Sequence, residues 1–215
     1  MSADVTSAFR RGTGVTVWTL GHSHHASELF LARLREHEIE FVVDVRSRPY
    51  SRHAPQYDRP ELEHTVSRAG ISYQWLGDKL GQRPEGSRFY DAEGYTLFDE
   101  LLKEQWFMKA IGLLEHEAET RRIALVCLEE EPERCHRWAL IGRLLAERGA
   151  SVRHIRADGR VQSQQEVDYR TGAAQESLFG DDERVWRSPE PMWDMRTRRG
   201  PGASDDDENY GPLGP

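Results

Sequence analysis

The amino-acid sequence predicts an α/β fold: a mainly parallel sheet flanked by helices in three layers, with an extended acidic C-terminal arm. Short apolar runs rich in β-branched residues recur along the chain and are typical of buried strands. Stretches with apolar residues at helical spacing lie between them. Polar turns follow several of the apolar runs, at the position where ligands bind in open parallel sheets.

Length and composition limit the class of protein. The 215 residues are enough for one α/β domain and a tail. A net charge of −8 argues against non-specific attraction to nucleic acid, although a local basic groove remains compatible with it. Two cysteines without a disulfide-like pattern, no apolar leader and no run of membrane-spanning length predict a cytoplasmic protein with no membrane partner.

The first part of the chain predicts a βαβ unit. Residues 1–14 are a polar lead-in, and the α/β domain is expected over residues 15–157. Residues 15–20 form the first predicted strand, followed by a helix capped by Ser23 or Ser27. The second strand spans residues 41–45, and a helix between two strands makes them parallel. The apolar face of the helix contains Leu29, Phe30, Leu34 and Ile39.

An arginine-rich loop follows the second strand over residues 46–59. Its guanidinium groups and rings suit phosphate and base recognition. A solvated loop stiffened by Pro49 and Pro55 is the alternative. The basic and aromatic residues of this loop are Arg46, Arg48, Arg52, Arg59, Tyr50, His53 and Tyr57.

Three further elements are expected before the central strand. Residues 60–69 form a short helix, residues 71–76 a third strand, and residues 97–117 a long helix. The apolar face of the long helix contains Phe98, Leu101, Leu102, Trp106, Ile111 and Leu114.

Both cysteines lie around the central strand, predicted over residues 123–128. Cys127 ends this strand, and Cys135 begins the next helix, directly before His136 and Arg137. The positive end of a helix dipole stabilises a thiolate or a bound anion, so this turn is the predicted active site. The alternative is that the cysteines are ordinary core residues.

A last strand is predicted over residues 151–155, and residues 158–215 form the predicted extended arm. Within the arm, residues 175–179 resemble the peptide by which many bacterial replication and repair proteins dock on the sliding clamp. Gln175, Leu178 and Phe179 would make that contact. A local anchor that folds back on the domain is the alternative.

Several segments together resemble the domain-of-unknown-function family 488, over about residues 16–156. The matching motifs are Thr19-Leu20-Gly21-His22-Ser23, Val43-Asp44-Val45-Arg46-Ser47, Gly70-Ile71-Ser72-Tyr73, Cys127-Leu128-Glu129 and Cys135-His136-Arg137. The loop at residues 76–84 departs from the tighter Leu-Gly-Gly-Arg usual in the family. The resemblance implies a shared fold and a shared site more directly than it implies a reaction.

The predicted site contains catalytic and substrate-binding residues. Cys135 is the nucleophile, His22 or His136 moves a proton, and Glu129 or Asp44 orients that histidine. The expected substrate is a nucleotide or a base in nucleic acid, in DNA repair or processing. The predicted substrate-binding residues are Ser23, Arg46, Arg52, Tyr73 and Arg137.

Three alternatives remain open at this stage. A carboxylate, Asp44 or Glu129, could activate water to hydrolyse a bond to a modified base. The chain could instead be a non-catalytic nucleotide- or DNA-binding module recruited by the clamp. A metal on Cys127, Cys135 and His136, with His22 as a further candidate ligand, is less favoured, because the cysteine spacing is unlike that of a zinc knuckle and Cys135 and His136 are adjacent. No cofactor is predicted, and the oligomeric state is not indicated.

Overall fold

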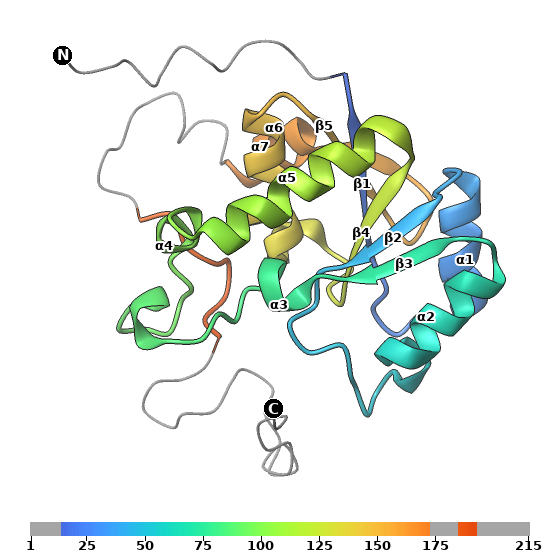
Figure 1. The fold of residues 1–215 in the computed structure, drawn as a ribbon, viewed down its shortest axis with the longest axis horizontal. Helices are drawn as coiled ribbons and strands as arrows, with labels where there is room; N and C mark the ends of the chain where they lie inside the picture. Colours follow the sequence, from blue (N-terminus) through green and yellow to red (C-terminus); the bar gives the residue numbers. More distant parts are fainter. Residues whose placement is uncertain (1–13, 173–184, 193–215) are drawn as a thin grey trace.

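The structure is a computed structural model that describes residues 14–172 and 185–192. Its sheet has six strands in the order β3-β2-β4-β1-β5-β6 (Figure 1). The first five strands pair in parallel, and only β6 is antiparallel to its neighbour. The strands are β1 (Thr16–Gly21), β2 (Phe41–Asp44), β3 (Ser72–Trp75), β4 (Ile123–Cys127), β5 (Ser151–Ile155) and β6 (Val161–Ser163).

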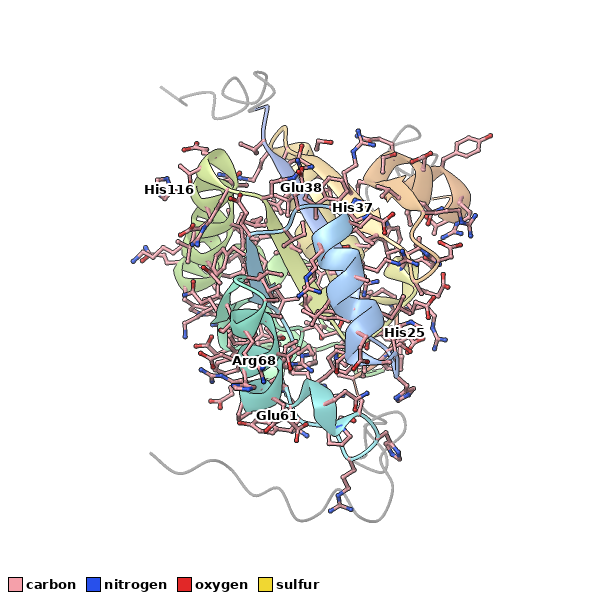
Figure 2. All side chains as sticks on the ribbon, turned by 90° about the vertical axis from the view of Figure 1, so that its right-hand side faces the viewer. His25, His37, Glu38, Glu61, Arg68 and His116 are labelled. Carbon is pink, nitrogen blue, oxygen red and sulfur yellow. The ribbon has the colours of Figure 1, made fainter. Side chains whose placement is uncertain are left out.

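Helices cover both faces of the sheet, as predicted. Side chains alternate between the faces of a strand, so neighbouring residues of β4 join different cores. Val126 packs with α1 (Ser27–Glu36) and α2 (Arg59–Arg68), whereas Leu125 packs with α5 (Gln105–Thr120). Figure 2 shows α1 and α2 on the face turned toward the viewer, with His116 of α5 apart from them. The three-layer α/β fold is therefore confirmed.

The register of the sheet sets the position of the candidate site. Gly21 at the end of β1 is paired with Cys127 at the end of β4, and Asp44 at the end of β2 is paired with Val126. Three neighbouring parallel strands thus end at the same level. The turns that follow them must share one edge of the sheet.

The remaining helices are short. They are α3 (Gly77–Leu80), α4 (Phe98–Leu102), α6 (Arg143–Glu147) and α7 (Gln164–Thr171), with a π-helix over Arg137–Gly142. Three-residue 3₁₀ helices occur at Pro55–Tyr57, Ser87–Phe89 and Pro132–Arg134. Among the described residues, every helix is too short or too polar to cross a membrane.

Two helix predictions differ from the structure. The predicted helix at 97–117 is divided into α4 and α5, because Glu104 is extended and its carboxylate accepts hydrogen bonds from Arg88 and Trp106. The predicted serine cap of α1 is wrong. Ala26 occupies that position without a side-chain cap, while Ser23 lies in a tight turn with a φ of 46°.

Part of the predicted extended arm is folded. β6 pairs with β5, and α7 begins with a capping box in which Ser163 and Glu166 bind each other's backbone. Ser163 and Glu166 have the spacing of this motif, so the sequence contained a signal that favours a helix here. Val167 of α7 is fully buried, which places residues 161–171 in the folded unit.

A second part of the arm returns to the domain. Trp186 donates a hydrogen bond to the Ala139 carbonyl at 2.8 Å and packs edge-on against Phe98. Trp193 and the clamp-like residues Gln175, Leu178 and Phe179 lie outside the described residues.

Candidate functional site

Main-chain hydrogen bonds hold the turns after β1 and β4 together beyond the strand ends. The His22 and Ser23 amides donate to the carbonyls of Cys127 and Leu128 at 3.0 and 2.8 Å. The backbones approach so closely that a Cβ on Gly21 would lie 1.9 Å from the Glu129 carbonyl oxygen. Glycine is therefore required at position 21, and the Thr-x-Gly-His-Ser motif has a steric cause.

A buried ion pair lies after β2. Asp44 accepts hydrogen bonds from the Arg46 guanidinium at 2.9 and 2.6 Å and from the Tyr73 hydroxyl at 2.8 Å. Asp44 is fully buried, and Arg46 is 6% exposed. Burial opposes the charge of Arg46, but the hydrogen bond and charge of Asp44 outweigh it and raise the pKa of the guanidinium.

His22 completes what we call the Asp44–Arg46–His22 network. Its Nε2 lies 3.0 Å from Arg46 Nη1, which can only donate, so Nε2 is the acceptor. Its Nδ1 therefore carries the hydrogen and donates to the Ser23 carbonyl at 2.8 Å. Burial and the charge of Arg46 lower the pKa of His22 to about 3. A neutral imidazole with both nitrogens engaged positions Arg46 instead of offering a free base.

Behind this network, Cys127, Cys135 and His136 form a group that we call the thiol–imidazole cluster. His136 Nδ1 lies 3.7 Å from Cys135 Sγ and 3.9 Å from Cys127 Sγ. The other ring nitrogen, Nε2, lies 3.2 Å from the Val45 carbonyl oxygen, which accepts its hydrogen. All three side chains are buried, and Cys135 has no exposed surface.

The two cysteines have opposite protonation preferences. Burial opposes ionisation of Cys135, but the Cys127 thiol and the charge of Arg137 outweigh it and lower the pKa of Cys135 well below its usual value. The hydrogen bond to Cys135, together with burial, raises the pKa of Cys127. Burial disfavours an imidazolium at His136, yet the Cys135 thiolate raises the pKa of the ring. Of the two cysteines, Cys135 is therefore the one that ionises more readily.

Glu129 contacts the thiol–imidazole cluster and is also partly exposed to solvent. Its carboxylate accepts a hydrogen bond from the Cys127 thiol at 3.1 Å, and its side chain is partly exposed. Burial, followed by the negative charge of Cys135, raises the pKa of Glu129 to about 7. This carboxyl group can therefore hold or release a proton near neutral pH.

Arg137 shapes the loop that carries Glu129. Its guanidinium donates to the main-chain carbonyls of Glu129 and Glu130, and it is fully buried. Its Nε has no hydrogen-bond partner among the described residues. Within the structure Arg137 contacts the loop, so a direct contact with substrate stays a prediction.

The other predicted substrate-binding residues lie around the edge. Ser23 is partly exposed beside His22, and Tyr73 is held by Asp44. Arg52 is exposed in the loop after β2.

Two groups outside the predicted site residues contact the site. Tyr57, expected only as part of the arginine-rich loop, stacks on His22 with ring centroids 4.1 Å apart, and the Val45 carbonyl orients His136. A main-chain carbonyl gives no signal in the sequence.

A hollow of about 370 Å³ lies at the other edge of the sheet, near the start of β1 and β4. It is lined by Thr16, Trp18, Glu40, Ala118, Glu119, Thr120, Arg121 and Arg122. A hollow of this kind is one candidate binding site. The chemistry favours the opposite edge, because the perturbed acids and bases converge there.

Comparison with known families adds an identification. Residues 26–144 match the family model described as Domain of unknown function DUF488. The chain belongs to the DUF488 family. The DUF488 match includes Asp44, Arg46, Glu129 and the Cys135 segment, but it begins after His22. Searches of curated proteins and of solved structures gave no match.

Proposed function

We propose that this DUF488 protein is an enzyme that acts on a nucleotide or on a base in nucleic acid, in DNA repair or processing, and that Glu129 is its general acid–base group. The observation that carries the proposal is the position of Glu129. It is the member of the site with both a partly exposed side chain and a pKa raised to about 7. A general acid–base group works best when its pKa is near the pH of the reaction.

The substrate class follows from the loop after β2. Arg46 begins this loop inside the site, and the loop continues through the exposed Arg48, Tyr50 and Arg52. Guanidinium groups attract phosphate, and an exposed tyrosine ring provides a stacking surface for a base. A nucleotide bound along this loop would have its reactive end near the Asp44–Arg46–His22 network.

In this proposal the network holds an anionic part of the substrate. Asp44 fixes the Arg46 guanidinium from one side, and His22 accepts a hydrogen bond from it on the other. A cation fixed before substrate arrives loses little entropy on binding and stabilises negative charge that develops during the reaction. Glu129 then transfers a proton to or from the bond that is cleaved.

A second candidate function uses the Cys135 thiolate as nucleophile. The contact of Cys135 Sγ with His136 Nδ1 at 3.7 Å, the hydrogen bond from the Arg137 amide to Cys135 Sγ at 3.5 Å and the lowered pKa of Cys135 support it. Because Cys135 has no exposed surface, this route requires a movement that exposes the thiol. Glu129 is already partly exposed, so we prefer the carboxylate route.

We propose that the enzyme works in the cytoplasm, because two free, buried thiols fit a reducing compartment. We further propose that residues 175–179 recruit the enzyme to the sliding clamp, on the sequence resemblance alone.

The proposed role of Glu129 is tested with the Glu129→Gln variant. Wild-type protein is incubated with oligonucleotides and nucleotides that contain modified bases, and released products are detected by mass spectrometry. Removing a general acid–base group lowers the rate by about 100-fold to 10,000-fold, so the variant should lose nearly all turnover. The matched control is Glu130→Gln, which removes the neighbouring carboxylate and should retain activity.

The outcomes separate the candidate functions. A fully active Glu129→Gln enzyme overturns the carboxylate route. A covalent adduct on Cys135, trapped by acid quench and found by intact-mass analysis, would support the nucleophile instead. Binding of the oligonucleotides without any turnover would support a non-catalytic binding module.

A further inference from the structure

We propose that Cys127, Cys135 and His136 form a binding site for a divalent metal ion of the zinc class. The inference goes beyond the proposed function, because these ligands lie behind Glu129 and would hold the ion whatever the substrate is. It rests on the positions of three buried ligand atoms, on the partners that orient them, and on their donor types.

The ligand atoms have the separation that a tetrahedral ion requires. Bonds of about 2.3 Å to sulfur and about 2.1 Å to nitrogen place neighbouring ligand atoms about 3.5 to 3.8 Å apart. His136 Nδ1 lies 3.7 and 3.9 Å from the two sulfur atoms. The two sulfurs and this nitrogen all lie within 4.8 Å of one another.

The surrounding groups orient the ligands. A histidine that binds a metal commonly donates its other ring N–H to a carbonyl or carboxylate, which directs the free nitrogen toward the ion. His136 does this through Nε2 and the Val45 carbonyl at 3.2 Å. The Arg137 amide donates to Cys135 Sγ at 3.5 Å and would stabilise that sulfur as a thiolate.

The fold brings the ligands together although the cysteine spacing is unlike that of a zinc knuckle. Cys127 ends β4 and Cys135 lies at the start of the next helical segment, so the turn between them returns the chain to the same place. Cys135 is extended with φ of −127°, whereas His136 is helical with φ of −61°. This change of backbone conformation lets adjacent side chains approach a common point.

The donor set indicates the class of ion. Two thiolates neutralise a dication, and sulfur with imidazole nitrogen favours zinc or cobalt over magnesium or calcium. Glu129 accepts a hydrogen bond from the Cys127 thiol at 3.1 Å, so its carboxylate lies beside one of the three ligands. Three protein ligands with a neighbouring acid–base carboxyl are also found in catalytic metal sites.

Cobalt(II) is the probe, because its spectrum reports its ligands. Full-length protein is stripped of metal with a chelator under reducing conditions and titrated with cobalt(II). We expect one equivalent to bind, with thiolate-to-cobalt charge-transfer bands and tetrahedral visible bands that zinc(II) bleaches and magnesium(II) does not. Absence of these bands, or binding only in large excess, overturns the proposal.

Variants assign the ligands. Cys127→Ser, Cys135→Ser and His136→Ala should each weaken cobalt binding at least tenfold and alter the bands. His116→Ala, on the exposed side of α5, is the matched control and should bind as the wild type does. If the ligand variants fail to fold, zinc(II) must still raise the melting temperature of the stripped wild type, because an ion that binds only the folded state stabilises it.

The proposed function and the metal site can fail separately. Glu129→Gln should lose turnover and still show the charge-transfer bands, because its carboxylate is outside the three-ligand set. A protein that binds cobalt and shows no turnover with any substrate refutes the function and leaves the metal site standing. Turnover that depends on Glu129 in a protein without cobalt bands refutes the metal site alone.

Discussion

At the scale of the residue, folding moves the pKa of Glu129 into the neutral range. Burial, followed by the negative charge of Cys135, raises the pKa of Glu129 to about 7 from an ordinary value of 4.5, and these effects outweigh the hydrogen bond from the Cys127 thiol. A carboxyl group with a raised pKa prefers to be protonated in the folded state. Glu129 therefore costs stability at the pH at which we propose that it works.

The sign of this effect gives a prediction for Glu129→Gln. Below pH 4.5 Glu129 is protonated in both the folded and the unfolded protein. Between pH 4.5 and about 7 it is protonated in the folded protein only, so the folded state binds more protons than the unfolded state. Wild-type stability should thus fall as the pH rises through this range, by about 3 kcal/mol relative to the glutamine variant. Urea unfolding of both metal-free proteins from pH 4 to 8 measures the difference. A difference that stays constant with pH would refute the expected penalty.

Asp44 and Arg46 illustrate what the sequence shows and what it does not. Their positions after a buried apolar run predicted that both would lie at the sheet edge, and they do. Their mutual ion pair and the contact with His22 depend on side-chain directions that spacing alone does not determine. As a result the sequence assigned His22 a proton-transfer role, whereas its burial beside a cation keeps it neutral.

At the scale of the element, the strands were easier to predict than the helix boundaries. A strand buried on both faces needs a continuous apolar run, and residues 41–45 and 123–128 are such runs. Helix ends depend on tertiary contacts. Glu104 interrupts one predicted helix because its carboxylate binds Arg88 and Trp106, and neither contact could be read from helical spacing.

The type of the helix after Cys135 was also not predictable from the sequence. A regular helix was expected to begin at Cys135, but Arg137–Gly142 is a π-helix that continues into α6. π-Helical turns are frequent at functional sites. Gly142 permits a close approach there, because a Cβ at this position would lie 2.5 Å from the side-chain oxygen of Gln164.

At the scale of the whole molecule, parallel strands that end at the same level bring functional side chains from distant segments to one edge of the sheet. β1, β2 and β4 are separated by long connections, yet their ends supply His22, Arg46 and Glu129 to one site. The boundary of the folded unit was harder to predict. Composition marked residues from 158 onward as an arm, but α7 and the Trp186 segment pack on the domain.

The clamp-like peptide gives a prediction for the whole chain. If residues 175–179 recruit the enzyme, immobilised sliding clamp should retain the wild-type protein and release a variant with Leu178→Ala and Phe179→Ala. The aliphatic side chain of Leu178 and the aromatic ring of Phe179 would supply most of the apolar contact, as anchor residues do in small interfaces. Turnover on free nucleotides should stay unchanged in that variant. Equal retention of both proteins would show that the peptide is not the docking site.

The central claim is that the fold gives Glu129 a proton affinity suited to neutral pH. Carbon-13 NMR of metal-free protein labelled at the glutamate carboxyl carbons tests it most directly, with Glu129→Gln used to assign the signal. We predict a titration midpoint near pH 7 for the signal that the variant lacks. A midpoint near the ordinary value of 4.5 would contradict the account.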